Sequence, residues 1–244
     1  MKYNRILLKL SGGALANESG FGFDQVKLDK ITDTIIKAVN NGVEVSVLVG
    51  GGNILRGKTA DYWKIERAEA DNIGMLATII NSLILRGVLT SKGMEKVRVM
   101  TSLPIDAVAE PYIRLKAKHH LDNGEIVIFG GGIGQPFVTT DYPSIQRAIE
   151  IKADAVLMAK QGTDGVYDSN PKENPDAKKY TTLTYDDAIA QNLKVADQSA
   201  FILAKEHNMP MYVFDFTAKD SISRICEGEN LGTYIGPNCE TKFA

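Results

Sequence analysis

The sequence predicts an α/β fold in which a mainly parallel sheet is covered by helices on both faces. Short β-branched runs alternate with helical patterns along most of the 244 residues, and strands that alternate with helices build such a sheet. Three of the expected strands also end in glycine-rich turns. Turns of this kind lie at the carboxyl edge of a parallel sheet, which is where these folds bind their ligands.

The expected strands are short runs rich in valine, isoleucine and leucine, as suits a sheet that is buried on both faces. They cover residues 3–10, 43–49, 97–100, 125–129, 155–159 and 211–216.

The first expected helix shows how the helices are bounded. Asp24 can cap it, and Gly42 lies where it would end. Its expected apolar face consists of Val26, Ile31, Ile35, Ala38 and Val39. Further helices are expected over 68–90, from Pro111 onward, over 141–151 with Asp141 as the cap, and over 184–191, 199–207 and 219–227. Residues 162–180 are rich in turn formers and charge, so we expect a functional or disordered loop.

Charge and composition exclude several classes of protein. The net charge is −2, so neither a nucleic-acid surface nor a polybasic membrane contact is expected. We expect no signal peptide, and no apolar run approaches the roughly 18 residues of a membrane span. Cys226 and Cys239 show no metal-site spacing and are too few for a disulfide scaffold. These features predict a soluble cytoplasmic protein.

The three glycine-rich turns predict a binding site for phosphates. They read "KLSGGAL", "VLVGGGN" and "GGGIGQPFVTTD". Glycine lets the backbone approach a ligand and direct several N–H groups at its oxygens, although one such turn by itself indicates only a tight connection. Three turns on one edge favour an anionic ligand with several phosphates. The polar residues that accompany them are Lys9, Ser11, Thr139, Thr140 and Asp141.

A second interpretation of the middle turn is the P-loop of nucleotide hydrolases. The pattern G-x-x-x-x-G-K-T is matched by Gly52, Gly57, Lys58 and Thr59. Asp215, after an apolar run, could then hold magnesium. A P-loop runs directly into a helix, but residues 58–71 show no clear apolar periodicity, so Thr59 is expected in a loop. The P-loop also leaves the other two turns without a role, which favours a different kind of glycine-rich turn.

Five motifs together resemble the bacterial uridylate kinases, a family of the amino-acid kinase superfamily. In chain order they are "LLKLSGGAL", "GGGNILRG", "ADNIGMLATIIN", "GQPFVTTD" and "DGVYDSNP". The resemblance covers almost the whole chain. Acetylglutamate, glutamate and aspartate kinases share the lysine-glycine start, but the third and fourth motifs separate the uridylate kinases from them.

The resemblance implies a three-layer αβα sandwich, the amino-acid kinase fold. It implies one domain over residues 1–244, with an acceptor lobe over about 1–150 and an ATP lobe over about 151–244. The implied reaction transfers the γ-phosphate of ATP to UMP in pyrimidine nucleotide biosynthesis. Magnesium would arrive with ATP, without a dedicated protein site. ATP and UMP would be the partners, the assembly a homo-hexamer, and nucleotide regulation by GTP and UTP occurs in the family.

The resemblance also implies roles for individual residues. Lys9 and Asp141 would be catalytic. The implied ATP contacts are Lys9, Leu10, Ser11, Gly12, Gly52, Arg56, Gln161, Tyr167 and Asn170. The implied UMP contacts are Gly51, Asp71, Ile133, Gly134, Gln135, Pro136, Phe137, Val138, Thr139 and Thr140. Arg56, and not Lys58, would then be the functional cation of the middle turn.

Two positions depart from the family pattern. Asn170 stands where an aspartate is usual before proline, so a carboxylate near the nucleotide is lost or is replaced by Asp168. Ile133 stands where threonine is common, which weakens the match of the UMP site. Neither departure touches Lys9 or Asp141.

Phosphoryl transfer between two phosphates needs alignment and neutralisation of charge, and it needs no general base. Lys9 would neutralise the transferring group. Asp141 would orient Lys9 or reach magnesium, besides capping a helix. Asp71 could accept hydrogen bonds from the ribose hydroxyls, although a lone aspartate on a helix is more commonly a solvated charge.

Two other functions are compatible with the resemblance. One is a kinase of the same superfamily that acts on a carboxylate or carbamate, and the other is a nucleotide-binding storage or sensor subunit without catalysis. Lys9 and Asp141 favour catalysis, and "GQPFVTTD" favours UMP as the acceptor.

Overall fold

The sheet contains ten strands, all from residues 1–171 and 173–244, which this computed structural model describes, with Lys58 described by its backbone alone. Their order is β10-β7-β9-β8-β6-β1-β2-β5-β3-β4. The pairs β8–β9 and β7–β10 are antiparallel and the other pairs are parallel. The strands are β1 Arg5–Leu10, β2 Glu44–Val49, β3 Val97–Thr101, β4 Glu110–Pro111, β5 Ile126–Gly130, β6 Ala155–Lys160, β7 Tyr180–Leu183, β8 Met211–Asp215, β9 Gly232–Ile235 and β10 Lys242–Phe243.

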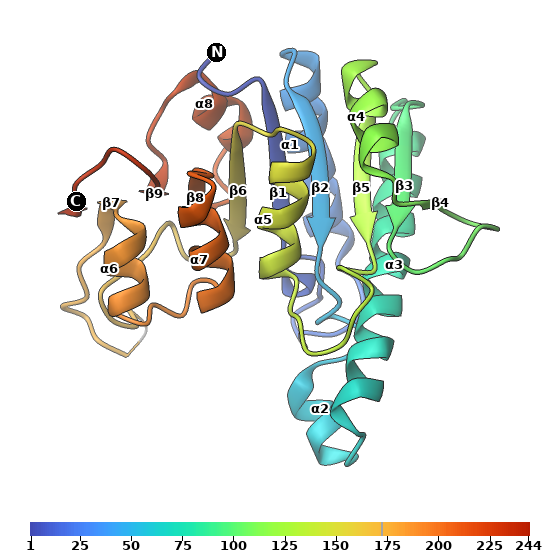
Figure 1. Ribbon diagram of the computed structural model, residues 1–244, viewed down its shortest axis with the longest axis horizontal. Coiled ribbons are helices and arrows are strands. Elements are labelled where there is room, and N and C mark those ends of the chain that lie inside the picture. Colours follow the sequence, from blue (N-terminus) through green and yellow to red (C-terminus); the bar gives the residue numbers. More distant parts are fainter. Residues whose placement is uncertain (172) are drawn as a thin grey trace.

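Helices cover both faces of this sheet (Figure 1). One layer holds α1 Gln25–Asn40, α3 Arg67–Ser91 and α8 Ser221–Glu227. The other layer holds α4 Arg114–Asp122, α5 Asp141–Glu150, α6 Tyr185–Ala190 and α7 Gln198–Glu206. Two short helices, η1 Gly12–Ala14 and α2 Gly57–Tyr62, follow β1 and β2. The arrangement is the three-layer αβα sandwich that the sequence predicted.

The strands are apolar on both faces because alternate residues pack against different layers. In β1, Ile6, Leu8 and Leu10 belong to the core beneath α1 and α8. Leu7 belongs to the core beneath α5 and α7. Lys9 lies on the same side of the strand as Leu7, so the alternation directs its side chain toward α5.

The first helix confirms most of its predicted features. The Asp24 carboxylate accepts a hydrogen bond of 3.1 Å from the Lys27 N–H, and Gly42 follows the helix with a φ of +86°, where glycine is least strained. The prediction for Val26 was wrong, because this side chain is 62% exposed. The buried stripe of α1 begins two residues later, at Leu28.

Three local predictions were wrong at element boundaries. Pro111 ends β4 instead of opening a helix: the neighbouring Tyr112 N–H donates to the Thr101 carbonyl at 2.9 Å, which keeps the chain extended. Asp141 is the first residue of α5, and Thr140 holds the cap position. Thr59 lies in α2 and not in a loop. Helix α2 packs mainly against α3. Little of its surface is therefore buried, and its sequence shows no apolar stripe.

The strands β4, β7, β9 and β10 were not predicted, because each has only two to four residues, too few to show a strand pattern of its own. Within the described residues, the 25-residue helix α3 is long and apolar enough to span a membrane, so the expectation of no such run was wrong. Leu85 and Leu89 on α3 are fully buried, and the helix packs on β2, β3 and β5. This packing is that of a core helix in a layered fold.

A buried pair of asparagines connects α3 to the turn after β2. Asn53 and Asn81 are both fully buried, and each amide donates to the other's carbonyl oxygen, at 3.1 and 2.7 Å. Asn81 also donates to the Gly50 carbonyl at 2.7 Å, and Asn53 donates to the Gly22 carbonyl at 3.0 Å. Buried polar groups are expensive unless they are paired, so this network fixes the position of the turn.

We expect Asn81→Ala to lower the free energy of unfolding by about 1–3 kcal/mol, because the Gly50 carbonyl and the Asn53 amide lose their partner in a buried site. Urea denaturation monitored by circular dichroism measures this change. The control is Asn41→Ala at an exposed position after α1, where we expect a change within about 0.5 kcal/mol. Equal losses in the two variants would contradict the role given to the buried pair.

Candidate active site

Three glycine-rich turns meet at the carboxyl edge of the sheet, after the adjacent strands β1, β2 and β5. The Gly50 N–H donates to the Leu10 carbonyl at 2.9 Å, and the Gly131 N–H donates to the Thr78 hydroxyl of α3 at 2.7 Å. A Cβ on Gly12 would lie 2.4 Å from the backbone nitrogen of Gly52. Glycine is therefore required where the first two turns touch.

A buried ion pair lies at the same edge. Lys9 Nζ pairs with Asp141 Oδ1, and the two side chains are 8% and 15% exposed. Asp141 stands in the first turn of α5, where the helix dipole stabilises a negative charge. The Asp197 N–H donates to Asp141 Oδ2 at 3.3 Å, and the Thr139 hydroxyl donates to the Asp197 carboxylate. The pair is thus held by β1, α5 and the start of α7.

A cavity of about 400 Å³ adjoins the residues that precede Asp141. We call it the acceptor pocket. Of the predicted UMP contacts, its lining includes Gly51, Asp71, Ile133, Gln135, Val138, Thr139 and Thr140. Two predicted ATP contacts, Gly52 and Arg56, line the same pocket. The structure therefore brings together residues that are far apart in sequence.

Asp71 connects α3 to the loop that closes the acceptor pocket. Its carboxylate accepts a hydrogen bond of 2.8 Å from the Phe137 N–H and two bonds, of 3.0 and 2.9 Å, from Arg67 Nε. A carboxylate has about four lone-pair sites, so Asp71 retains capacity for a ligand hydroxyl.

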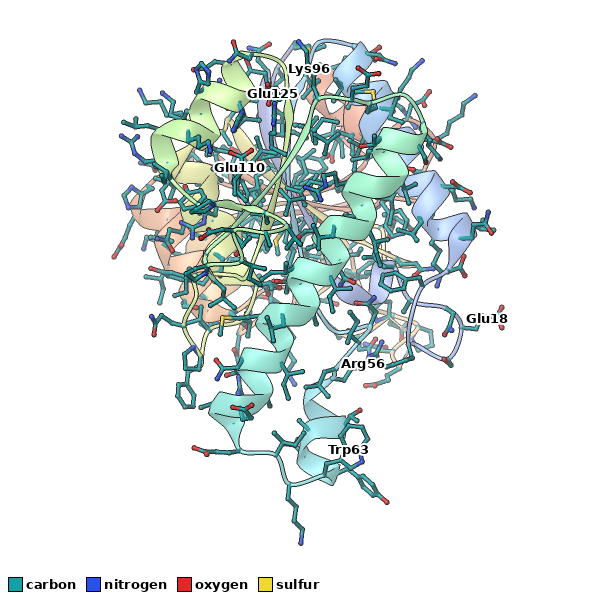
Figure 2. The ribbon with its side chains drawn as sticks, turned by 90° about the vertical axis from the view of Figure 1, so that its right-hand side faces the viewer. Glu18, Arg56, Trp63, Lys96, Glu110 and Glu125 are labelled. Atoms are coloured by element: carbon teal, nitrogen blue, oxygen red, sulfur yellow. The ribbon has the colours of Figure 1, made fainter. Side chains whose placement is uncertain are left out.

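Arg56 lies at the rim of the acceptor pocket. Its Nε donates to the Gly52 carbonyl at 3.1 Å, and a Cβ on Gly20 would lie 3.1 Å from Nη2. Figure 2 shows Arg56 between α2 and the loop that carries Glu18. The guanidinium is exposed, so it is accessible to an anion.

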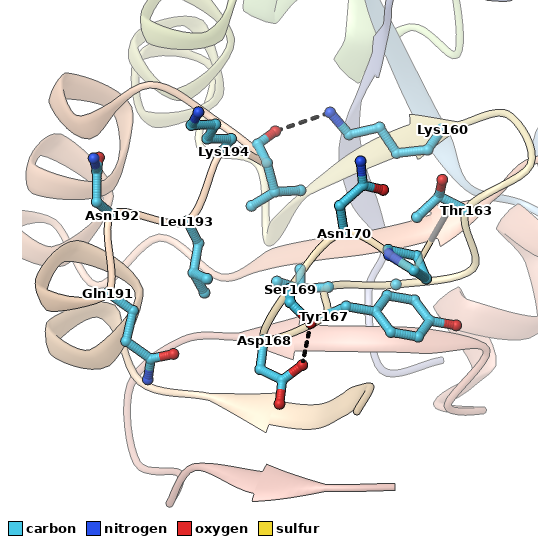
Figure 3. A pocket seen from close by; sticks show the side chains of 14 residues that line it. Lys160, Thr163, Tyr167, Asp168, Ser169, Asn170, Gln191, Asn192, Leu193 and Lys194 are labelled. Atoms are coloured by element: carbon cyan, nitrogen blue, oxygen red, sulfur yellow. Dashed lines mark hydrogen bonds between the residues drawn. The ribbon is translucent and has the colours of Figure 1, made fainter. Parts of the chain in front are cut away.

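A second cavity, of about 540 Å³, lies between the segment 163–171 and the segment 191–195 (Figure 3). We call it the nucleotide pocket. Tyr167 and Asn170, both predicted ATP contacts, line it. The Tyr167 hydroxyl donates to Asp164 at 2.7 Å, and this bond raises the pKa of Tyr167 to about 12. The phenol is therefore neutral near pH 7.

The described part of the loop 162–180, which leaves out residue 172, is tied by hydrogen bonds. Asp168 Oδ1 accepts from the Lys178 N–H at 2.9 Å, and Tyr167 pairs with Lys179 in an isolated antiparallel bridge. One wall of the nucleotide pocket is therefore built by the segment predicted to be a functional or disordered loop.

Other predicted site residues lie between or outside the two pockets. Lys9, Leu10, Ser11 and Gly12 are in the lining of neither pocket, but they occupy the edge at the Lys9–Asp141 pair. The Leu10 side chain is buried in the core, so only its main chain can meet a ligand. Gln161 is exposed after β6. Three predicted UMP contacts in the loop before α5 lie outside the lining of the acceptor pocket: Gly134, Pro136 and Phe137. The Phe137 side chain is 68% exposed.

Two residues of the site were missed by sequence reasoning. Lys160 ends the apolar strand β6, much as Lys9 stands near the end of β1, and this parallel was a signal that could have identified it. Asp197, which touches Asp141 and Thr139, shows only the signal of a residue before a helix.

The topology excludes the P-loop interpretation. Asp215 lies at the end of β8, which β6 and β1 separate from β2. Its carboxylate accepts from the Gly162 and Thr217 N–H groups, at 3.2 and 2.9 Å, and so stabilises local turns. Helix α2 does begin at Gly57, but it has only six residues. The side chain of Lys58 lies outside the described residues.

The described residues hold no group of three or more His, Cys, Asp or Glu side chains placed to bind a metal ion. At the edge itself, the carboxylate of Asp141 is neutralised by Lys9. This donor set does not form a cation site by itself.

The chain resembles known proteins over its full length. The amino acid kinase family model matches residues 4–215. A uridylate kinase of Frankia alni is 54% identical over 234 residues, which are 96% of this chain and 91% of that protein. A uridylate kinase of Rickettsia bellii is 46% identical over 96% of this chain and 98% of that protein. The solved structure of UMP kinase from Bacillus anthracis superimposes with a TM-score of 0.97, at 57% identity and 100% coverage of both chains.

The fold and the edge that carries its two pockets are those of a phosphotransferase of the amino acid kinase family, and the chain belongs to that family. Its named relatives here are uridylate kinases.

Proposed function

We propose that this protein is a uridylate kinase, which transfers the γ-phosphoryl group of ATP to UMP and yields ADP and UDP for pyrimidine biosynthesis. The names of relatives at 54% and 46% identity support UMP as the acceptor over a carboxylate or carbamate. The observation that carries the proposal is the Lys9–Asp141 pair at the sheet edge between two pockets.

In this proposal UMP occupies the acceptor pocket and the adenosine of ATP occupies the nucleotide pocket. The acceptor pocket is lined by residues numbered 51–140 and the nucleotide pocket by residues numbered 160–195. This separation supports an acceptor lobe over about 1–150 and an ATP lobe over about 151–244. Arg56, at the rim, would contact phosphate from the acceptor side.

The proposed mechanism uses charge and position. The UMP phosphate is already ionised, so its oxygen attacks the γ-phosphorus without a general base. Lys9 neutralises charge on the transferring group, and the backbone N–H groups of the glycine turns are preorganised donors. Asp141 orients the Lys9 ammonium through their ion pair.

Magnesium belongs to the proposal as a companion of ATP, as the resemblance to the uridylate kinases implies. Bound to the phosphates, it would neutralise part of their charge. Asp141 pairs with Lys9, and the Asp197 N–H donates to Asp141. These two residues would approach such an ion from the protein side.

A cytoplasmic location and a homo-hexameric assembly are also part of the proposal. Leu76 and Ile80 of α3 are 47% and 46% exposed. Because these two residues stand four apart on α3, their side chains lie on one face of the helix. A contiguous exposed apolar patch marks an interaction surface, which supports assembly through α3.

We expect Lys9→Ala to lower kcat by at least about 10²–10³, because a preorganised charge at the transferring group is removed. Lys58→Ala should change kcat less than about tenfold, since its backbone lies on α2, beyond the edge (Figure 1). ADP release in a coupled assay measures both rates. Removing Lys9 leaves Asp141 unpaired and can lower stability, so the assays are run well below each variant's measured melting temperature. A dead Lys58→Ala enzyme beside a healthy Lys9→Ala enzyme would contradict the assignment.

We expect dUMP to be a much poorer acceptor than UMP. If Asp71 binds a ribose hydroxyl, the missing hydroxyl leaves the carboxylate less well satisfied, which costs on the order of 1–3 kcal/mol. The ratio of kcat/KM for the two acceptors measures this preference, and Asp71→Asn should reduce it. Equal kcat/KM values in the wild type would refute the role of Asp71.

A further inference from the structure

Lys160 is a second lysine on the sheet face that carries Lys9. Strands β1 and β6 are parallel neighbours, with Lys9 opposite Met158 and Leu10 opposite Ala159. Because side chains alternate along a strand, Lys160 shares the face of Met158 and Lys9. Lys160 follows Ala159, so it lies two residues beyond the position opposite Lys9, toward the carboxyl edge of the sheet.

The side chain of Lys160 lines the nucleotide pocket. Its ammonium donates to the Val195 carbonyl at 2.8 Å. Figure 3 shows this bond, with Lys160 on the same side of the pocket as Asn170. Whereas Lys9 is paired with Asp141, the ion pairs found among residues 1–171 and 173–244 do not include Lys160. The pocket thus contains a cation that donates to a neutral carbonyl.

The surroundings oppose the charge of this lysine. Burial, followed by the positive charge of Lys9, lowers the pKa of Lys160 to about 8, while Asp141 acts in the opposite direction. Asp215 is its register partner on β8. The other charged side chains of the pocket wall are Asp168 and Lys194. A polyanion in this place would reverse the balance and favour the ammonium form.

We propose that Lys160 is a second phosphate-binding cation, which exchanges the Val195 carbonyl for oxygens of the ATP phosphate chain. This inference rests on the proposed function for the identity of the nucleotide. Lys160 lines the pocket assigned to adenosine and shares a sheet face with Lys9 of the neighbouring strand, so phosphates that extend from this pocket to Lys9 would pass it. An ammonium has three donors, and bonds to a charged acceptor are stronger than bonds to a carbonyl.

The competing account is structural, with Lys160 serving only to hold the segment before α7 against β6. A structural role predicts that substitution weakens the binding of adenosine and of ATP alike. A phosphate contact predicts that substitution weakens the binding of ATP selectively and removes the proton uptake that accompanies it. The two accounts are therefore separable by binding measurements that need no acceptor.

The first experiment compares Lys160→Met and Lys160→Arg with the wild type by isothermal titration of MgATP and of adenosine. We expect the dissociation constant for MgATP to rise about tenfold or more in Lys160→Met and to recover in part in Lys160→Arg. The constant for adenosine should stay within twofold. The control is Lys37→Met, which removes an exposed lysine from α1 in the opposite layer and should change neither constant.

The second experiment titrates MgATP at pH 8 in HEPES and in Tris buffer, whose heats of ionisation differ and which offer no phosphate to the site. With a pKa of about 8, Lys160 is about half neutral before binding. Wild type should therefore take up about half a proton more than Lys160→Met. Equal uptake with unchanged MgATP affinity would overturn the inference, and so would parallel loss of adenosine and MgATP binding. A wild type that binds MgATP but does not phosphorylate UMP would refute the proposed function, while the Lys160 comparison would still be decided by binding.

Discussion

The ion pair between Lys9 and Asp141 is the interaction on which the organisation of the sheet edge depends. Its members come from β1 and α5, and both are largely buried. A buried charge without a partner is strongly destabilising, so α5 must start where its first turn meets the lysine. Asp197 and Thr139 extend the same constraint to the start of α7 and to the loop before α5. In this way one charge pair positions the elements that border both pockets.

Glycine supplies the second constraint. The turns after β1 and β2 approach so closely that a Cβ on Gly12 would collide with the Gly52 backbone. The turn after β2 is fixed from its other side by the buried Asn53–Asn81 pair. A glycine-rich segment held on two sides keeps its N–H groups in place, and such preorganisation is what charge stabilisation in phosphoryl transfer needs. Rigidity and close approach therefore come from the same residues.

Local patterns predicted the layers, the cap at Asp24 and the long helix α3, because each depends on neighbours in sequence. The turns and Lys9 were predictable for the same reason, since strand ends and glycines can be seen in a short window. Asp197 was missed because its importance arises only when α7 is brought beside α5. Lys160 does show a local signal, at the end of an apolar strand, but its nearness to the site follows only from the pairing of β6 with β1. Pro111 was misjudged because it pairs with Thr101 of β3, a contact that the residues next to the proline do not reveal. Short strands such as β9 likewise need their partners before they have a pattern.

In the proposed mechanism the phosphoryl group passes directly between two ligands aligned at one edge, without a covalent intermediate on the protein. The stereochemistry of transfer tests it most directly. ATP whose γ-phosphorus is chiral through oxygen isotopes is reacted with UMP, and the configuration at phosphorus in UDP is determined by nuclear magnetic resonance after chemical derivatisation. A single in-line displacement predicts inversion. Retention would show two successive displacements through a phosphorylated residue, and it would contradict an edge that acts by charge and alignment.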